Sequence, residues 1–178
     1  MTNHLFSLVR DGAADPTRTV IETHEGRHHS YADLLARSGA YAAALVAAGV
    51  APGDRVAVQV EKSAEVIFLY LGVVRAGAMF LPLNTAYTPA EIGYFLGDAE
   101  PALFVCDPAK REALAGAAAG VRQVWTLDAA GTGSAAEAAD AQDGAAFADV
   151  PRAPEDLAAI LYTSGTTGRP WSARSCRR

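Results

Sequence analysis

Long hydrophobic runs are absent from this 178-residue chain, and cysteine is scarce. No apolar stretch approaches the roughly 20 residues of a membrane-spanning helix, so we expect no membrane segment. The start, Met-Thr-Asn-His-Leu-Phe-Ser, lacks the charged region followed by an apolar stretch that marks a signal peptide. The two cysteines, Cys106 and Cys176, lie far apart, which argues against a disulfide framework and for a reducing cytoplasm. Cys106 lies in an apolar run and is expected in the core.

Positive charge is also in short supply. The 15 lysine and arginine residues face 20 aspartate and glutamate residues, a formal net charge of −5, which argues against nucleic-acid binding. The four histidines have no spacing typical of a metal site, so we expect no metal ligand and place them in solvent; they are His4, His24, His28 and His29. Hydrophobic residues make up 51% of the chain, which suffices for one globular core.

Apolar, β-branched segments alternate with segments of helical periodicity. After a short helix over 5–9 and a hairpin that begins at 18–23, we expect strands over 55–60, 79–83, 102–106, 122–127 and 157–162. We expect helices over 31–48, 64–76, 88–97 and 108–118, and a weak one over 134–141 in an Ala- and Gly-rich segment. This alternation predicts the α/β class, with a mostly parallel sheet and crossover helices.

Helix starts are marked by residues that cap them. Ser30 followed by Asp33 is similar to a capping box, and Ser63 is expected to cap the next helix. Thr88-Pro89-Ala90-Glu91 is a full capping box with proline in the first turn.

Several acidic residues near strand and helix ends are candidates for a site. Charged residues over 61–65 follow the first core strand, where they can line a site, but we expect them to be a solvated helix start. Others lie at turns or helix ends, where capping explains them: Asp98, Glu100, Asp107 and Asp128.

After Tyr162 the chain changes within one residue from an apolar strand to hydroxyls and glycines. Gly165 and Gly168 allow tight bends and close approach of a ligand to backbone N–H groups. Four hydroxyls are added by Thr163, Ser164, Thr166 and Thr167. A strand that opens into such a loop suits phosphate binding, although the Walker A pattern is absent. By composition alone a flexible surface turn remains open.

The order of these residues narrows the interpretation. Tyr-Thr-Ser-Gly-Thr-Thr-Gly-Arg-Pro, preceded by Leu-Ala-Ala-Ile-Leu, resembles the phosphate-binding loop of adenylate-forming enzymes, which include acyl-CoA synthetases, luciferases and nonribosomal-peptide adenylation domains. The resemblance implies that the β- and γ-phosphates of ATP are held by Thr163, Ser164, Gly165, Thr166, Thr167 and Gly168. It also implies Mg²⁺ and the co-substrate CoA in the full-length enzyme. It assigns no catalytic residue and no metal ligand to this chain.

A second segment, Leu81-Pro82-Leu83-Asn84-Thr85-Ala86-Tyr87-Thr88, resembles the family's Pro-Leu-Asn segment. Its Asn-Thr-Ala-Tyr-Thr form is similar to that of malonyl-CoA synthetases. The resemblance implies an acid–CoA ligase that uses malonate or a similar small carboxylic acid. The family role of this segment is to support the active-site cavity.

The resemblance covers residues 3–170 and predicts an incomplete N-terminal part of the adenylate-forming large domain. Residues 171–178 form a non-family tail, with Trp171 where the family has lysine, and we interpret it as a truncated or frameshifted end. We expect the strand over 157–162 to keep an unpaired edge, which favours aggregation. We also expect the chain by itself to show no ligase activity.

Two alternatives to an acid–CoA ligase remain for this chain. One is a non-enzymatic nucleotide- or phosphate-binding or interaction fragment. The other is a complete small α/β nucleotide-binding module, against which the end of the chain directly after the loop argues.

Overall fold

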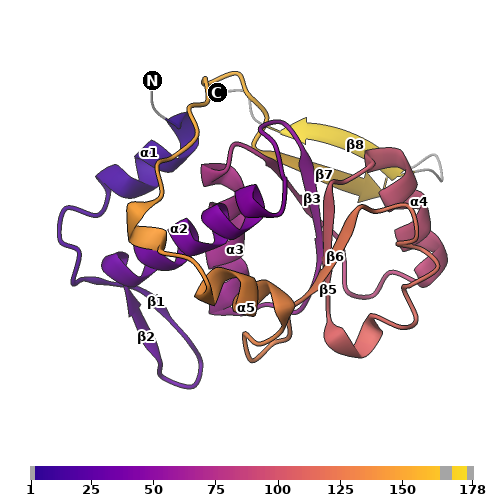
Figure 1. The fold of residues 1–178 in the computed structure, drawn as a ribbon, viewed down its shortest axis with the longest axis horizontal. Helices are drawn as coiled ribbons and strands as arrows, with labels where there is room; N and C mark the ends of the chain where they lie inside the picture. The colour runs from indigo at the N-terminus through magenta and orange to yellow at the C-terminus, as the bar shows by residue number, and fades with distance from the viewer. Residues whose placement is uncertain (1–2, 165–169, 176–178) are drawn as a thin grey trace.

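The computed structural model of the chain describes residues 3–164 and 170–175, which form a six-stranded sheet with helices on both faces (Figure 1). The strand order is β6-β5-β3-β4-β7-β8, in which β8 alone runs antiparallel to its neighbour. These strands are β3 (Arg55–Gln59), β4 (Met79–Pro82), β5 (Leu103–Cys106), β6 (Gln123–Thr126), β7 (Ala159–Ser164) and β8 (Pro170–Ser175). The predicted α/β class with a mostly parallel sheet is confirmed.

The helices form two layers, one on each side of the sheet (Figure 1). One layer holds α1 (His4–Asp11), α2 (Tyr31–Ala47), α3 (Ala64–Arg75) and α5 (Ser134–Asp140), and the other holds α4 (Pro89–Ala99). The remaining elements are the antiparallel hairpin β1 (Thr19–Glu22) with β2 (His28–Ser30), and two 3₁₀ turns, η1 (Pro108–Lys110) and η2 (Gly144–Ala146).

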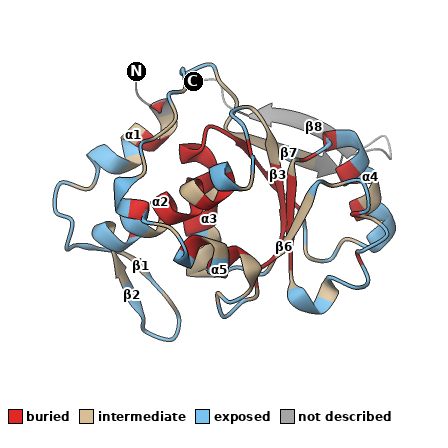
Figure 2. Ribbon diagram, viewed as in Figure 1, coloured by how far each residue is buried: buried red, intermediate tan, exposed pale blue. Residues whose placement is uncertain are grey.

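Alternation along the strands divides the core in two. Val56 and Val58 of β3 pack into the cluster on the α2 and α3 side, whereas Ala57 packs into the cluster beneath α4. Successive side chains of a strand point to opposite faces, so each central strand contributes to both cores. The central strands are buried almost throughout (Figure 2). Cys106 is fully buried in the α4 core, as expected.

The helix starts agree with the sequence. The Ser30 side chain accepts from the Asp33 N–H while Asp33 accepts from the Ser30 N–H, so the box forms with aspartate in place of glutamate. Thr88 and Glu91 form the same reciprocal box at α4, and Ser63 caps α3. Each box satisfies backbone donors that the first helical turn leaves free.

Two expectations about the helices and strands are wrong. The segment over 108–118 forms only the turn η1 followed by hydrogen-bonded turns, in which bonds to the third and fourth preceding residue mix. Gly116 lies within it, and glycine weakens a continuous helix. The far edge of β7 is not left unpaired, because β8 pairs with it along its whole length, from Ala159 opposite Ser175 to Ser164 opposite Pro170.

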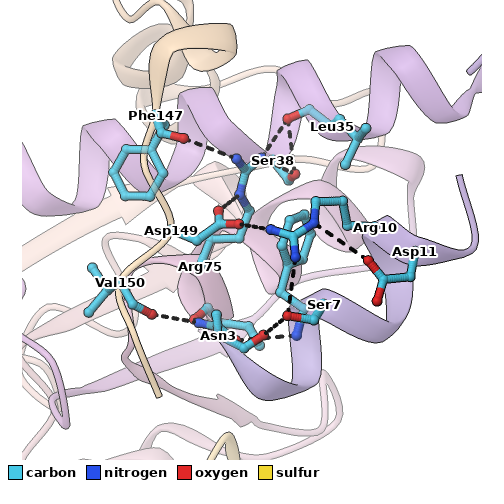
Figure 3. Close-up of polar contacts among 12 residues, drawn as sticks. Asn3, Ser7, Arg10, Asp11, Leu35, Ser38, Arg75, Phe147, Asp149 and Val150 are labelled. Atoms are coloured by element: carbon cyan, nitrogen blue, oxygen red, sulfur yellow. Dashed lines mark hydrogen bonds and ion pairs between the residues drawn. The ribbon is translucent and has the colours of Figure 1, made fainter. Parts of the chain in front are cut away.

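A buried arginine joins three helices to the segment that precedes β7 (Figure 3). The Arg75 side chain, 7% exposed, donates through Nε to Asp149 at 2.6 Å. Its Nη1 donates to the Leu35 carbonyl at 2.6 Å and to the Ser38 hydroxyl at 2.9 Å in α2. The guanidinium also lies 4.5 Å from the centre of the Phe6 ring of α1. The charge is therefore both paired and hydrogen-bonded, as burial requires.

Candidate functional site

The strand that precedes the candidate loop, β7, ends at the carboxyl edge of the sheet, where parallel α/β sheets bind ligands. Thr163 and Ser164 are the last two residues of β7, and their backbones pair with Trp171 and Pro170 of β8. The predicted phosphate-binding residues Gly165, Thr166, Thr167 and Gly168 lie outside the described residues. Since β4 and β7 are adjacent and parallel, the segment after β4 leaves the sheet at the same edge at which β7 ends.

The segment that follows β4 is held through its carbonyl oxygens. Gln59, 1% exposed at the end of β3, donates through Nε2 to the Asn84 carbonyl at 2.9 Å and to the Tyr87 carbonyl at 3.3 Å. Lys110 Nζ donates to the Thr85 carbonyl at 2.7 Å. Three of the segment's carbonyls are thus fixed by side chains from β3 and η1. Neither Gln59 nor Lys110 was singled out by the sequence, because both reach the segment only through the fold.

The strand that carries the loop is tied to α4 by Tyr162. The Tyr162 hydroxyl donates to Asp98 Oδ2 at 2.5 Å, and its ring lies 4.7 Å from the Phe95 ring. Partial burial, and then the bond to Asp98, raise the pKa of Tyr162, so the hydroxyl stays a proton donor through neutral pH. The sequence suggested capping roles for both Asp98 and Asp107. Asp107 does cap η1, whereas Asp98 instead accepts the hydrogen bond from Tyr162.

Glu65 is not part of a solvated helix start, contrary to expectation. Its side chain is 22% exposed and accepts from Arg37 Nε at 3.0 Å and from the Tyr41 hydroxyl at 2.6 Å. Arg37 also pairs with Asp140 of α5 at 2.5 Å. The network joins α2, α3 and α5 on the face opposite α4. It is therefore a structural cluster on the other side of the sheet from Tyr162.

The histidines divide between solvent and packing. His24 is exposed, as expected, but the expectation is wrong for His29, which is half-buried with its ring edge-on to Phe68 at 5.3 Å between centroids. Over residues 3–164 and 170–175, no three His, Cys, Asp or Glu side chains are grouped so as to hold a metal ion. In the same part of the chain, no helix has both the length and the apolar character to cross a membrane.

Comparison with known proteins gives a consistent match over nearly the whole chain. A family model described as "AMP-binding enzyme" matches residues 8–171. Among solved structures, ATP-bound MatB from Rhodopseudomonas palustris is 52% identical with a TM-score of 0.92, over 97% of this chain and 34% of MatB. The chain corresponds to the N-terminal part of the adenylate-forming domain of MatB.

The curated relatives include an antimetabolite synthetase and a probable CoA ligase. AMB antimetabolite synthetase AmbB of Pseudomonas aeruginosa is 36% identical over 94% of this chain and 12% of the relative. Probable CoA ligase CCL9 of Humulus lupulus is 33% identical over 93% of this chain and 33% of the relative. The chain therefore spans a third or less of the length of these relatives.

Proposed function

Because this chain belongs to the family of AMP-binding enzymes, we propose that it forms the phosphate-binding part of an ATP-dependent acid–CoA ligase. In this reaction a carboxylate attacks the α-phosphorus of ATP, giving an acyl-adenylate and pyrophosphate. The CoA thiol then displaces AMP to give the thioester. One observation carries the proposal: β7, whose last three residues begin the Tyr-Thr-Ser-Gly-Thr-Thr-Gly run, ends at the carboxyl edge of a fold that matches ATP-bound MatB with a TM-score of 0.92.

The loop's task in this proposal is to hold the β- and γ-phosphates. Backbone N–H groups and hydroxyls provide donors for phosphate oxygens, through Thr163, Ser164, Gly165, Thr166, Thr167 and Gly168. Holding the leaving pyrophosphate fixes the α-phosphorus for attack, and positioning of this kind supplies much of the rate in phosphoryl chemistry. The described residues form no metal-binding cluster, so we assign no residue to Mg²⁺ and derive no step through it.

We infer malonate, or a similar small carboxylic acid, as the substrate. Two observations support this: the 52% identity with MatB, and the Asn-Thr-Ala-Tyr-Thr form of residues 84–88. A second candidate is the adenylation part of a peptide-forming synthetase. It is favoured by the 35% identity with CymA of Salinispora arenicola, a probable non-canonical nonribosomal peptide synthetase, and it predicts an amino acid as the acid that is activated. In either case we expect the enzyme in the cytoplasm.

The 178-residue chain by itself is expected to be silent as a ligase, since it spans 34% of MatB. Catalysis of this kind needs the acid, the α-phosphate and the thiol held at reacting distance in a site that excludes water. A phosphate loop contributes one wall of such a site. What remains to the chain alone is weak binding of a phosphate group.

The experiment joins residues 1–170 to the remaining two thirds of R. palustris MatB. Pyrophosphate release and thioester formation are then measured with acetate, malonate, methylmalonate, longer fatty acids and amino acids. We expect malonate to be preferred, and Gly165→Val to abolish turnover with the melting temperature unchanged. Preference for an amino acid would support the second candidate instead. A Gly165→Val hybrid that melts cooperatively and keeps full activity would refute the loop's role.

A control arm uses the 178-residue chain in an AMP-release assay with malonate, ATP and CoA. No AMP above a reaction without malonate is expected. Malonate-dependent AMP release from a cooperatively melting sample would show that this chain is itself sufficient for adenylation.

A further inference from the structure

We propose that Tyr162 and Asp98 form a latch that positions the end of β7, from which the proposed phosphate loop continues, against α4. The latch consists of Tyr162, Asp98 and Phe95, and it rests on the proposed phosphate-binding role of the loop. Tyr162 directly precedes Thr163, the first of the proposed phosphate-binding residues. A side chain at this point sets where β7 ends and the proposed loop begins.

The contacts of Tyr162 are specific at both ends of its side chain. Its hydroxyl donates to Asp98 Oδ2 at 2.5 Å, across 64 positions of sequence. Among the described residues, no other hydrogen bond or ion pair involves the Asp98 side chain. The Tyr162 ring packs on Phe95, which is 2% exposed and so provides a fixed surface. The hydrogen bond from Tyr162 to Asp98 is exposed to solvent.

The position of β7 in the sheet shows why such a latch matters. In the described residues, β7 pairs with β4 at one register position, Ala159 opposite Phe80. The end of β7 that carries the loop is therefore not held by a ladder to β4. Ile160 and Tyr162 instead pack toward the core beneath α4, and only Tyr162 adds a polar tie to the helix. The Tyr162 side chain thus holds the end of β7 in place, as backbone pairing holds the other strands of the sheet.

The same helix also contacts the other segment at this edge. The Phe95 ring lies 4.8 Å from the Tyr87 ring and 4.7 Å from the Tyr162 ring. Tyr87 belongs to the segment that Gln59 and Lys110 hold. Phe95 thus packs on both segments that leave the carboxyl edge beside β4 and β7. The latch therefore fixes the end of β7 relative to the segment after β4, not only relative to β8.

The test measures binding of inorganic pyrophosphate to the 178-residue chain by NMR titration, alongside urea unfolding. Tyr162→Phe removes the hydroxyl and keeps the ring, and Asp98→Leu removes the acceptor. Each should weaken binding by about fivefold, the order of what one solvent-exposed side-chain hydrogen bond contributes. The double variant should lose no more than either single one, because both changes break the same bond.

Three controls separate positioning from charge and from stability. Asp98→Asn removes the negative charge but keeps an oxygen that accepts from Tyr162, so its affinity should stay close to that of the wild type. Tyr94→Phe changes an exposed tyrosine of α4, 47% exposed, and should leave affinity unchanged. Gly39→Ala lowers stability far from the loop and should leave affinity unchanged in the folded protein.

The outcomes are distinguishable. If the wild-type chain does not bind pyrophosphate, the latch is overturned, whereas the proposed function is decided by the activity of the hybrid with MatB. If it binds and Tyr162→Phe binds equally well, the latch alone is overturned. If Asp98→Asn weakens binding as much as Asp98→Leu, or if Gly39→Ala weakens it as much as Tyr162→Phe, the hydrogen bond has no positioning role and the latch is again overturned.

Discussion

Gly39 in α2 and Gly144 in η2 lie backbone against backbone. A Cβ atom on Gly39 would clash with the Gly144 carbonyl oxygen, and one on Gly144 would clash with the Ala36 carbonyl oxygen. The segment between α5 and β7 therefore lies directly against α2 (Figure 1). At Gly39 and Gly144 there is no room for a side chain between them. Arg75 and Asp149 tie the same segment down a few residues later (Figure 3). The segment that leads toward β7 is thus held against α2 and α3.

Gly39→Ala should destabilise the protein. Backbone cannot move aside as a side-chain tip can, so α2 and η2 must separate, at a cost of about 2 kcal/mol in the free energy of unfolding. Urea unfolding measures the change. The matched control is Gly97→Ala in α4, where a Cβ would meet nothing within 4 Å and helix propensity should raise stability by about 0.5 kcal/mol. Equal effects of the two substitutions would contradict this account of the contact.

Arg75→Met should cost about 3 kcal/mol, because it leaves the Asp149 carboxylate buried without its main partner. Arg75→Lys should recover only part of this loss, since one ammonium group does not reproduce the guanidinium's bonds to α2 and to Asp149 at once. Arg10 serves as the control. It contacts the same carboxylate at 3.5 Å from a half-exposed position, and Arg10→Ala should cost about 0.5 kcal/mol or less. A similar cost for both arginines would show that Asp149 does not depend on Arg75.

The Tyr41 hydroxyl gives stability a dependence on alkaline pH. Burial, and then its bond to Glu65, raise the pKa of Tyr41 above that of an unfolded tyrosine, about 10. A raised pKa in the folded state means that the contribution is complete below pH 10 and is lost as pH rises above it. The stability advantage of the wild type over Tyr41→Phe should therefore shrink above pH 10, by up to about 1.4 kcal/mol per pH unit. Urea unfolding of both proteins from pH 7 to pH 11 measures it, and a constant difference would contradict the assigned shift.

Removal of residues 171–178 should expose the edge of β7, since this deletion takes away nearly all of β8. An open strand edge offers unpaired N–H and C=O groups to a second molecule, so aggregation should increase. Light scattering against concentration compares the shortened and complete chains. As a control, removal of residues 176–178 alone leaves β8 in place and should change nothing. Identical scattering of all three chains would show that β8 does not protect this edge.

The sequence by itself determined the features that depend on near neighbours. The capping boxes at Ser30 and Thr88 formed as predicted, because their donors and acceptors lie three residues apart and need no distant partner. The order of strands and helices, and with it the parallel sheet, followed from hydrophobic periodicity. The family was evident from one unbroken run after Tyr162, and the match over residues 8–171 confirms it.

Only the tertiary structure decided which distant groups meet. Glu65 was expected in solvent but pairs with Arg37 and Tyr41, because α2 packs against α3. Asp98 was expected to cap but holds Tyr162, 64 residues further on. Nothing in the local pattern specifies such contacts, since they depend on how the layers stack. In the same way β8 forms from a tail without periodicity. The edge of β7 supplies hydrogen-bond partners for the backbone of this tail, and the sequence of the tail does not indicate this pairing.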